Sequence, residues 1–140
     1  GTTLLFHHAI KNPHETYGVD IDLTPDHQDT LTKRGVHAIK GDSRTLSLSL
    51  DLDGPFDVIF IDGNHTYEGV RADFKNYFDL VSPHGIIAFH DINQNNEELS
   101  CQVHEFWAEL KKTYRTMEIN HATPHTGYGI GIIFKDDATL

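Results

Sequence analysis

Four short runs of apolar and β-branched residues recur along the chain at a regular interval. They span residues 16–21, 36–40, 56–61 and 85–89, and the polar or amphipathic stretches between them are the length of a helix with its two turns. The runs 56–61 and 85–89 are almost continuously apolar, as are strands that are buried on both faces of a parallel sheet. We therefore predict an α/β fold whose mostly parallel sheet has these two strands adjacent at its centre.

Capping residues indicate helices between the predicted strands. Thr24, followed by proline, predicts the start of one helix, and Gly35 predicts its end. Thr66 predicts the start of a second helix that continues to residues 82–83, where a proline follows a serine. Apolar residues at helical spacing from Val103 onward predict a third helix that ends near residue 114.

The two ends of the chain depart from this alternation. Residues 115–120 and 128–135 read as two strands joined by a turn-rich segment, so we expect an antiparallel strand at the C-terminal side of the sheet. Residues 2–11 read as a helix with no strand before it. A sheet that starts this way resembles one that lacks its first strand. We therefore expect a single domain over residues 1–140 that is incomplete at its N-terminal side.

Composition narrows the function classes. The 140 residues include 11 Lys and Arg against 21 Asp and Glu, a net charge of −10 that argues against a nucleic-acid partner. No apolar run is long enough to suggest a membrane helix. A single Cys excludes an internal disulfide and a Cys-rich zinc site, so a reducing cytoplasm is the expected compartment. The sequence leaves the oligomeric state open, a homo-oligomer included.

Two acidic segments lie at the ends of the first two of the four apolar runs. Asp20 and Asp22 end the first of these segments, where a carboxylate can accept hydrogen bonds from a ribose diol or can simply be a loop acid. Asp42 and Ser43 follow the next strand, where either residue could meet an adenine edge or cap a helix. Both interpretations stay open for both segments.

The strongest constellation follows the two central strands. Asp62 ends the first of them and His65 lies three residues later, so the imidazole could act as a general base. His90 and Asp91 end the neighbouring strand. Because adjacent strands are only about 4.8 Å apart, the two aspartates are expected to share a cation. Carboxylate ligands favour Mg²⁺ or Mn²⁺, and the imidazole of His90 would add a nitrogen ligand.

The order of these segments resembles a known family. Residues 61–74 read Ile-Asp-Gly-Asn-His-Thr-Tyr-Glu-Gly-Val-Arg-Ala-Asp-Phe, and residues 85–91 read Gly-Ile-Ile-Ala-Phe-His-Asp. With the segments 17–22 and 41–43, they resemble class I S-adenosylmethionine-dependent methyltransferases. The resemblance is to the subgroup of macrolide-sugar and glycan O-methyltransferases and cephalosporin-hydroxylase-like proteins. It implies a Rossmann-like methyltransferase sheet in a three-layer sandwich, and residues 1–3 resemble the end of that family's glycine loop.

The resemblance also implies a role for each candidate residue. His65 is expected to be the catalytic base, and the metal ligands are expected to be Asp62, Asp91 and His90; His90 stands where the sugar O-methyltransferases commonly have an acid. The residues expected to contact S-adenosyl-L-methionine are Gly1, Asp20, Ile21, Asp42, Ser43 and Asp62. The implied reaction is O-methylation of a hydroxyl on a small molecule or sugar, assisted by Mg²⁺ or Mn²⁺. A non-catalytic remnant of the fold and a metal-dependent hydrolase are the alternatives.

Overall fold

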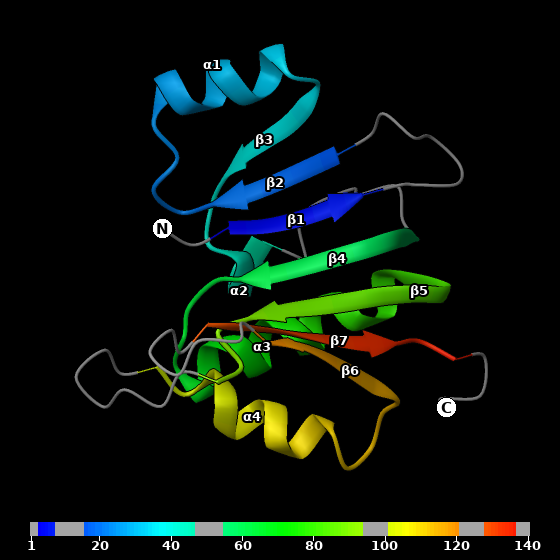
Figure 1. Ribbon diagram of the computed structural model, residues 1–140. Coiled ribbons are helices and arrows are strands. Elements are labelled where there is room, and N and C mark those ends of the chain that lie inside the picture. The colour runs from blue at the N-terminus through cyan, green and yellow to red at the C-terminus, as the bar shows by residue number, and fades with distance from the viewer. Residues whose placement is uncertain (1–2, 8–15, 47–54, 94–100, 121–127, 137–140) are drawn as a thin grey trace.

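A mixed seven-stranded sheet runs through the part of the chain that the computed structural model describes, which is residues 3–7, 16–46, 55–93, 101–120 and 128–136 (Figure 1). Its strands in chain order are β1 (Thr3–His7), β2 (Thr16–Asp20), β3 (Val36–Lys40), β4 (Phe56–Asp62), β5 (Val81–His90), β6 (Thr116–Asn120) and β7 (Gly129–Phe134). In space the order is β3-β2-β1-β4-β5-β7-β6. The four strands predicted from the apolar runs are all present.

Strand directions confirm the predicted architecture. β2 is parallel to β3, and β4 is parallel to β5, with Ile59 opposite Ile87 in the register. β7 is antiparallel to both β5 and β6, as expected for the C-terminal strand. The α/β fold, its central β4–β5 pair and its antiparallel C-terminal strand are therefore confirmed.

The predicted helix over residues 2–11 is wrong. Residues 3–7 instead form β1, which lies between β2 and β4 and is antiparallel to both. Without it, β2 and β4 would each leave a row of unpaired backbone N–H and C=O groups in the middle of the sheet. A short apolar run also fits a strand and a buried helix segment equally well, so its own sequence could not decide between them. β1 adds a second antiparallel strand to the sheet.

The helices follow the predicted caps. α1 (Pro25–Lys33) begins after Thr24, whose hydroxyl accepts a hydrogen bond from His27 N at 3.3 Å. Short α2 (Ser43–Leu46) follows β3, and α4 (Val103–Leu110) precedes β6. None of the described helices is long and apolar enough to cross a membrane.

α3 (Tyr67–Tyr77) ends earlier than predicted. A 3₁₀ turn, η1 (Phe78–Leu80), follows it, and β5 already begins at Val81. Pro83 therefore lies in the strand rather than beyond the end of the helix. The register between β4 and β5 shifts at this point, and such an irregularity accommodates a residue that cannot donate a ladder hydrogen bond.

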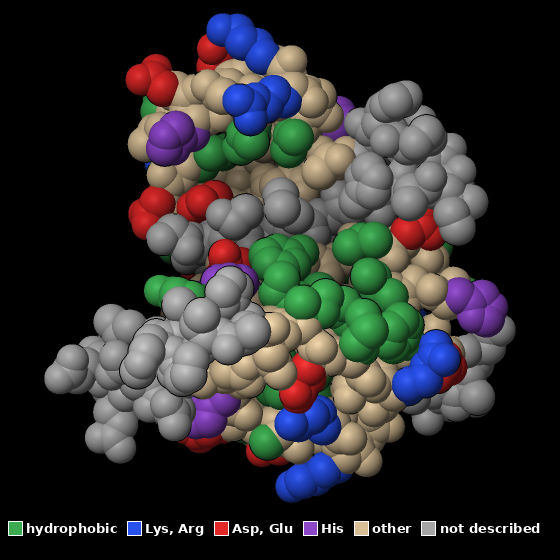
Figure 2. Space-filling view, in the orientation of Figure 1, with side chains coloured by type: hydrophobic (Ala, Val, Ile, Leu, Met, Phe, Trp, Pro, Cys, Tyr) green, Lys and Arg blue, Asp and Glu red, His purple; other side chains and the backbone are tan. Residues whose placement is uncertain are grey.

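The core lies between the sheet and the helices α3 and α4. Phe74 of α3 packs on Phe106 of α4 with ring centroids 5.7 Å apart, and Trp107 packs on Phe89 of β5 at 5.8 Å. On the opposite face, alternate residues such as Phe60 are only half-buried. Figure 2 shows a broad hydrophobic area at the centre of the molecule on the side facing the viewer. The carboxyl ends of β2, β4 and β5 share one edge of the sheet, where the candidate residues gather.

Candidate active site

Asp62 and His65 occupy the turn between β4 and α3. The strand delivers Asp62 to the edge of the sheet, since Ile59 and Ile61 are buried and anchor it. The Asn64 side chain then accepts hydrogen bonds from the backbone N–H and the hydroxyl of Thr66, at 2.9 and 2.7 Å. These local bonds define the backbone on both sides of His65.

The segment before α4 holds the same turn from its other side. Gln102 donates its backbone N–H to the carbonyl of His65 at 2.7 Å. Its side-chain oxygen accepts the first backbone N–H of α3, from Tyr67, at 3.1 Å. The position of His65 therefore depends on contacts from two distant parts of the chain.

His90 ends β5 at the same edge of the sheet, and Asp91 follows it. Successive residues of a strand point to opposite faces, so two neighbours do not normally serve one site. Asp91 has a φ of 61°, in the left-handed region that few non-glycine residues adopt. This turn brings its carboxylate to the same side as His90, with Oδ1 3.0 Å from His90 Nδ1. An unusual backbone conformation thus creates the juxtaposition.

The four predicted side chains converge as expected. His65 Nε2 lies 3.2 Å from Asp62 Oδ1, and His65 Nδ1 lies 3.4 Å from Asp91 Oδ2. His90 Nδ1 lies 3.4 Å from Asp62 Oδ1. Asp91 is buried, with 3% of its surface exposed, whereas the side chains of Asp62 and His65 are each 35% exposed. The cluster therefore has a buried acid behind and a solvent-accessible acid–imidazole pair in front.

Electrostatics in the cluster makes His65 a stronger base. The hydrogen bond to Asp62 raises the pKa of His65 above its ordinary value, and the nearby charge of Asp91 adds to this. In turn the hydrogen bond from His65 lowers the pKa of Asp62, with a further contribution from His90. The two carboxylates are the groups that stabilise a proton on this imidazole.

The cluster also has the donor set of a metal site. One ligand atom each from Asp62, His90 and Asp91 lies within 4.8 Å of the others. His90 Nδ1 and Asp91 Oδ1 are buried and, although they lie 3.0 Å apart, neither forms a hydrogen bond of suitable geometry among the described residues. Buried polar atoms without partners are costly, and a cation between two carboxylates would satisfy both atoms at once. These residues therefore fit the divalent ion that the sequence predicted.

Asp20 lies further along the same edge, at the end of β2. Its Oδ1 accepts the backbone N–H of Asp22 at 2.8 Å, and its carbonyl accepts the backbone N–H of Gly41 at 3.1 Å. Asp20 also lines a hollow of about 200 Å³ formed with α1. The next residue, Ile21, is 42% exposed, which leaves an apolar surface beside the carboxylate.

Asp42 and Ser43 are arranged differently from each other. Asp42 forms an ion pair with Arg44, with Oδ2 2.6 Å from the guanidinium, and the hydrogen bonds from Arg44 lower the pKa of Asp42. Ser43 is buried, and its hydroxyl donates to Asp73 of α3 at 2.7 Å. The predicted adenine-side pair is thus split between the surface and the core. Gly1 lies outside the described residues.

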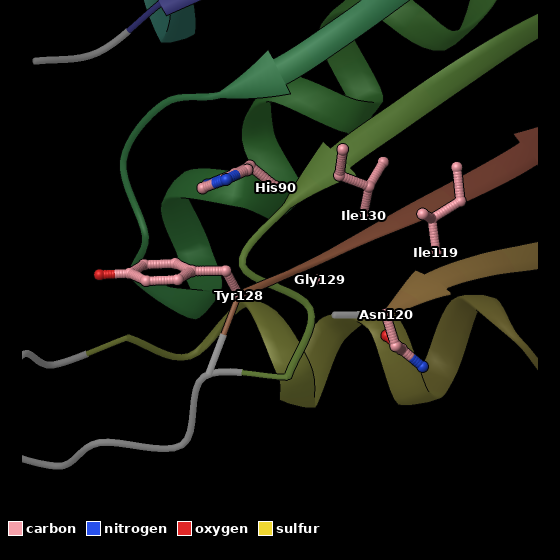
Figure 3. Close-up of a pocket in the computed structure, with 6 residues that line it drawn as sticks. All are labelled: His90, Ile119, Asn120, Tyr128, Gly129 and Ile130. Carbon is pink, nitrogen blue, oxygen red and sulfur yellow. The ribbon is translucent and has the colours of Figure 1, made fainter. Parts of the chain in front are cut away.

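An apolar hollow adjoins the cluster at the start of β7 (Figure 3). It has a volume of about 250 Å³ and is lined by His90, Ile119, Asn120, Tyr128, Gly129 and Ile130. The rings of His90 and Tyr128 are stacked, with centroids 6.0 Å apart. Tyr128 and Ile119 are more than half exposed. Apart from His90, sequence reasoning did not single out these wall residues, because the pattern marked them only as part of two late strands.

The chain is similar in sequence to a known protein family and to two curated proteins. A family model described as a methyltransferase domain matches residues 1–92. Mycinamicin VI 2''-O-methyltransferase of Micromonospora griseorubida is 32% identical over 78 residues, which are 56% of this chain and 19% of that protein. The uncharacterized protein y4gI of Sinorhizobium fredii is 30% identical over 82 residues, 59% of this chain and 8% of that protein. The matches thus span less than a fifth of the length of these curated relatives.

Solved structures show the same fold. The O-methyltransferase TomG from Streptomyces achromogenes, solved with SAM, has a TM-score of 0.60 and 18% identity over 79% of this chain and 56% of that one. The MycE methyltransferase of the mycinamycin pathway, solved with Mg and SAH, has a TM-score of 0.57 and 20% identity over 89% of this chain and 38% of that one. The resemblance to macrolide O-methyltransferases is confirmed, and because the family model covers well over half of its residues, the chain belongs to the methyltransferase domain family.

Proposed function

We propose that this domain transfers a methyl group from S-adenosylmethionine to a hydroxyl oxygen of a small molecule or sugar. The observation that carries the proposal is the convergence of Asp62, His65, His90 and Asp91 at one edge of the sheet, beside an apolar hollow. Transfer to oxygen by in-line displacement needs a positioned acceptor and a group that takes the hydroxyl proton. The cluster and the hollow supply these two elements.

His65 is the proposed general base. Its side chain is 35% exposed, so an acceptor can approach it, and both of its ring nitrogens face carboxylates. The hydroxyl proton would pass to the imidazole as the oxygen attacks the methyl carbon. Asp62 and Asp91 would then stabilise the imidazolium, because a positive charge on the ring strengthens its attraction to both.

Asp62, His90 and Asp91 are the proposed ligands of a divalent cation. Their support is the pair of unpartnered buried atoms and the mutual spacing of the three side chains. A bound Mg²⁺ or Mn²⁺ supplies Lewis acidity, which lowers the pKa of an acceptor hydroxyl. His90 connects this group to the hollow, since its ring also forms part of the wall.

Asp20 is the proposed contact to the ribose of the cofactor. A carboxylate at the end of the second parallel strand is well placed to accept hydrogen bonds from a ribose diol. The hydrogen bond from the Asp22 backbone orients one of its oxygens, and the exposed Ile21 offers an apolar surface next to it. Asp42 is a further candidate on the loop after β3, whereas the buried hydroxyl of Ser43 serves the core instead.

The acceptor is expected to carry an apolar part next to its hydroxyl group. The hollow beside His90 has Ile119, Ile130 and the Tyr128 ring in its wall, and these side chains favour a hydrocarbon or the apolar face of a sugar. A polar acceptor with no apolar portion would leave this surface uncovered.

Methyl transfer from isotopically labelled S-adenosylmethionine to a panel of hydroxylated acceptors tests the proposal. We expect His65→Ala to lower turnover by about 10²–10⁴-fold, the usual contribution of a general base, with cofactor affinity unchanged in calorimetry. His84→Ala is the matched control, because His84 is an exposed histidine at the other end of β5. A His65→Ala variant with full turnover would reject the assignment of the base, and a protein that carries the complete glycine loop and still binds no cofactor would reject the function.

A further inference from the structure

Cys101, just ahead of α4, is part of a second group of metal-ligating side chains. One ligand atom each from His65, Asp91 and Cys101 lies within 4.8 Å of the others. Asp91 and Cys101 are buried, with 3% and 4% of their surfaces exposed, while His65 is half-buried. This group shares Asp91 with the proposed divalent-cation site, but it differs from that site in having a sulfur ligand.

The fold holds these three residues together through the contacts of Gln102. Its backbone N–H donates to the His65 carbonyl at 2.7 Å, and its side chain accepts from Tyr67 N at 3.1 Å. Cys101 is the preceding residue, so the same contacts keep its thiol against the turn that carries His65. The left-handed conformation of Asp91 brings the carboxylate to the same place. The juxtaposition therefore rests on backbone bonds rather than on one side-chain rotamer.

The spacing and the chemistry of the donors distinguish this group from its neighbour. Two ligands at zinc bond lengths of about 2.1 Å lie roughly 3.4 Å apart in a tetrahedral site. His65 Nδ1 and Asp91 Oδ2 are 3.4 Å apart. Thiolate and imidazole ligands select zinc over Mg²⁺, which prefers oxygen.

We propose that His65, Asp91 and Cys101 form a binding site for Zn²⁺, which overlaps the hard-cation group of Asp62, His90 and Asp91 at Asp91 alone. As the zinc–sulfur bond forms, the Cys101 thiol releases its proton to the solvent, and no oxidant or reductant takes part. Three protein ligands leave a fourth position for water.

Zinc at this site would inhibit methyl transfer. It would occupy a ring nitrogen of His65 and draw Asp91 away from the other group, so the imidazole could no longer take a proton. This consequence depends on the proposed function, whereas zinc binding itself does not. The test below therefore reads out binding without reference to turnover.

Titration with Co²⁺ in excess Mg²⁺ tests the site. Cobalt bound by a thiolate gives a near-ultraviolet charge-transfer band, and cobalt bound only by oxygen and nitrogen does not. Cys101 is the single cysteine of the chain, so such a band reports this residue alone. We expect the wild-type protein to show the band, and zinc to displace it with a stoichiometry of about one ion per chain.

Three variants separate the triad from the neighbouring group. Cys101→Ser is expected to abolish the band, and His65→Ala to weaken the zinc-competed affinity by about tenfold or more. His90→Ala, which removes a histidine from the other group only, is expected to keep the band and to lose no affinity for zinc. If Cys101→Ser fails to fold, a second measurement takes its place: bound zinc is expected to protect the wild-type thiol from an alkylating reagent. His65→Ala is expected to lose this protection.

Three results would overturn the proposal. The first is a wild-type protein with neither the band nor zinc protection of its thiol. The second is a zinc-competed affinity that His65→Ala leaves unchanged, which would mean that Cys101 binds the ion with other ligands. The third is an equal loss in His90→Ala and His65→Ala, which would merge the two groups into one site.

Discussion

Asp73 is a carboxyl group in the core whose protonation should affect the stability of the whole domain. It is fully buried in α3, where Oδ1 accepts from the Ser43 hydroxyl at 2.7 Å and Oδ2 has no hydrogen-bond partner among the described residues. Burial raises the pKa of Asp73 to about 6, since a buried charge without enough partners is unfavourable. The neutral acid is thus the form that the fold prefers.

Asp73→Asn should remove a pH dependence of stability. Between the ordinary carboxyl pKa of 3.8 and about 6, the unfolded chain loses this proton while the native protein keeps it. The free energy of unfolding of the wild type should therefore fall as pH rises through this window, by on the order of 2 kcal/mol relative to Asp73→Asn. Urea unfolding of both proteins at several pH values measures the difference. Parallel profiles would show that Asp73 does not titrate in this window.

Asp20→Ala tests a single contact to the cofactor. Loss of the carboxylate leaves the ribose hydroxyls unpaired, so we expect affinity for S-adenosylmethionine to weaken by about 1–3 kcal/mol in calorimetry. Asp22→Ala is the matched control, because Asp22 is an exposed neighbour that touches Asp20 through its backbone N–H alone in the contacts described above. Equal affinities of the two variants would remove Asp20 from the cofactor site.

At the scale of elements, the cap of α3 serves stability and the site together. The Thr66 hydroxyl accepts from Gly69 N at 3.1 Å and donates to Asn64, so it links the helix to the turn that carries His65. The hydroxyl of Thr24 caps α1 in the same manner, far from the cluster in sequence. The two N-caps are therefore similar in structure, but only the Thr66 cap lies next to the proposed general base, His65.

Thr66→Ala and Thr24→Ala should separate these two effects. Each variant should lower the free energy of unfolding by about 1 kcal/mol, the usual cost of losing an N-cap. Only Thr66→Ala should also reduce turnover, by about tenfold or more, because His65 loses its fixed position. Denaturant unfolding and turnover are measured on both variants. Unchanged turnover in Thr66→Ala would mean that the Gln102 contacts alone position His65.

At the scale of the whole molecule, the proposed metal group exists because the sheet places two distant segments side by side. Asp62 comes from the end of β4, and His90 and Asp91 come from the end of β5. Parallel pairing sets both strand ends at one edge, within reach of a single ion.

Removal of divalent ions should therefore stop methyl transfer. We expect a chelator to abolish turnover and Mg²⁺ or Mn²⁺ to restore it, because the acceptor hydroxyl would lose its Lewis acid. Asp91→Asn should require a higher concentration of the restoring ion than the wild type, since it removes one negative ligand. Full turnover in chelator would reject the metal and leave the assignment of His65 intact.

The sequence by itself determined the features that depend on neighbouring residues. Thr24 and Thr66 predicted the starts of α1 and α3, because a hydroxyl just before a helix can accept a hydrogen bond from one of its first backbone N–H groups. The continuous apolar runs predicted that β4 and β5 lie in the interior of the sheet, because such runs are typical of parallel strands with a neighbour on each side. Asp62 and Asp91 could be paired from this alone, since the ends of adjacent parallel strands meet.

Tertiary structure decided what depends on residues far apart in the chain. Residues 3–7 form β1 because the backbone groups along the edges of β2 and β4 need hydrogen-bond partners. The short apolar pattern of residues 3–7 does not reveal this need. The Ser43 side chain lies in the core because Asp73, thirty residues later, accepts a hydrogen bond from its hydroxyl there. Cys101 lies beside His65 because the next residue, Gln102, donates its backbone N–H to the His65 carbonyl. A local pattern records propensity and burial, whereas contacts between distant residues form only when the sheet brings their strands together.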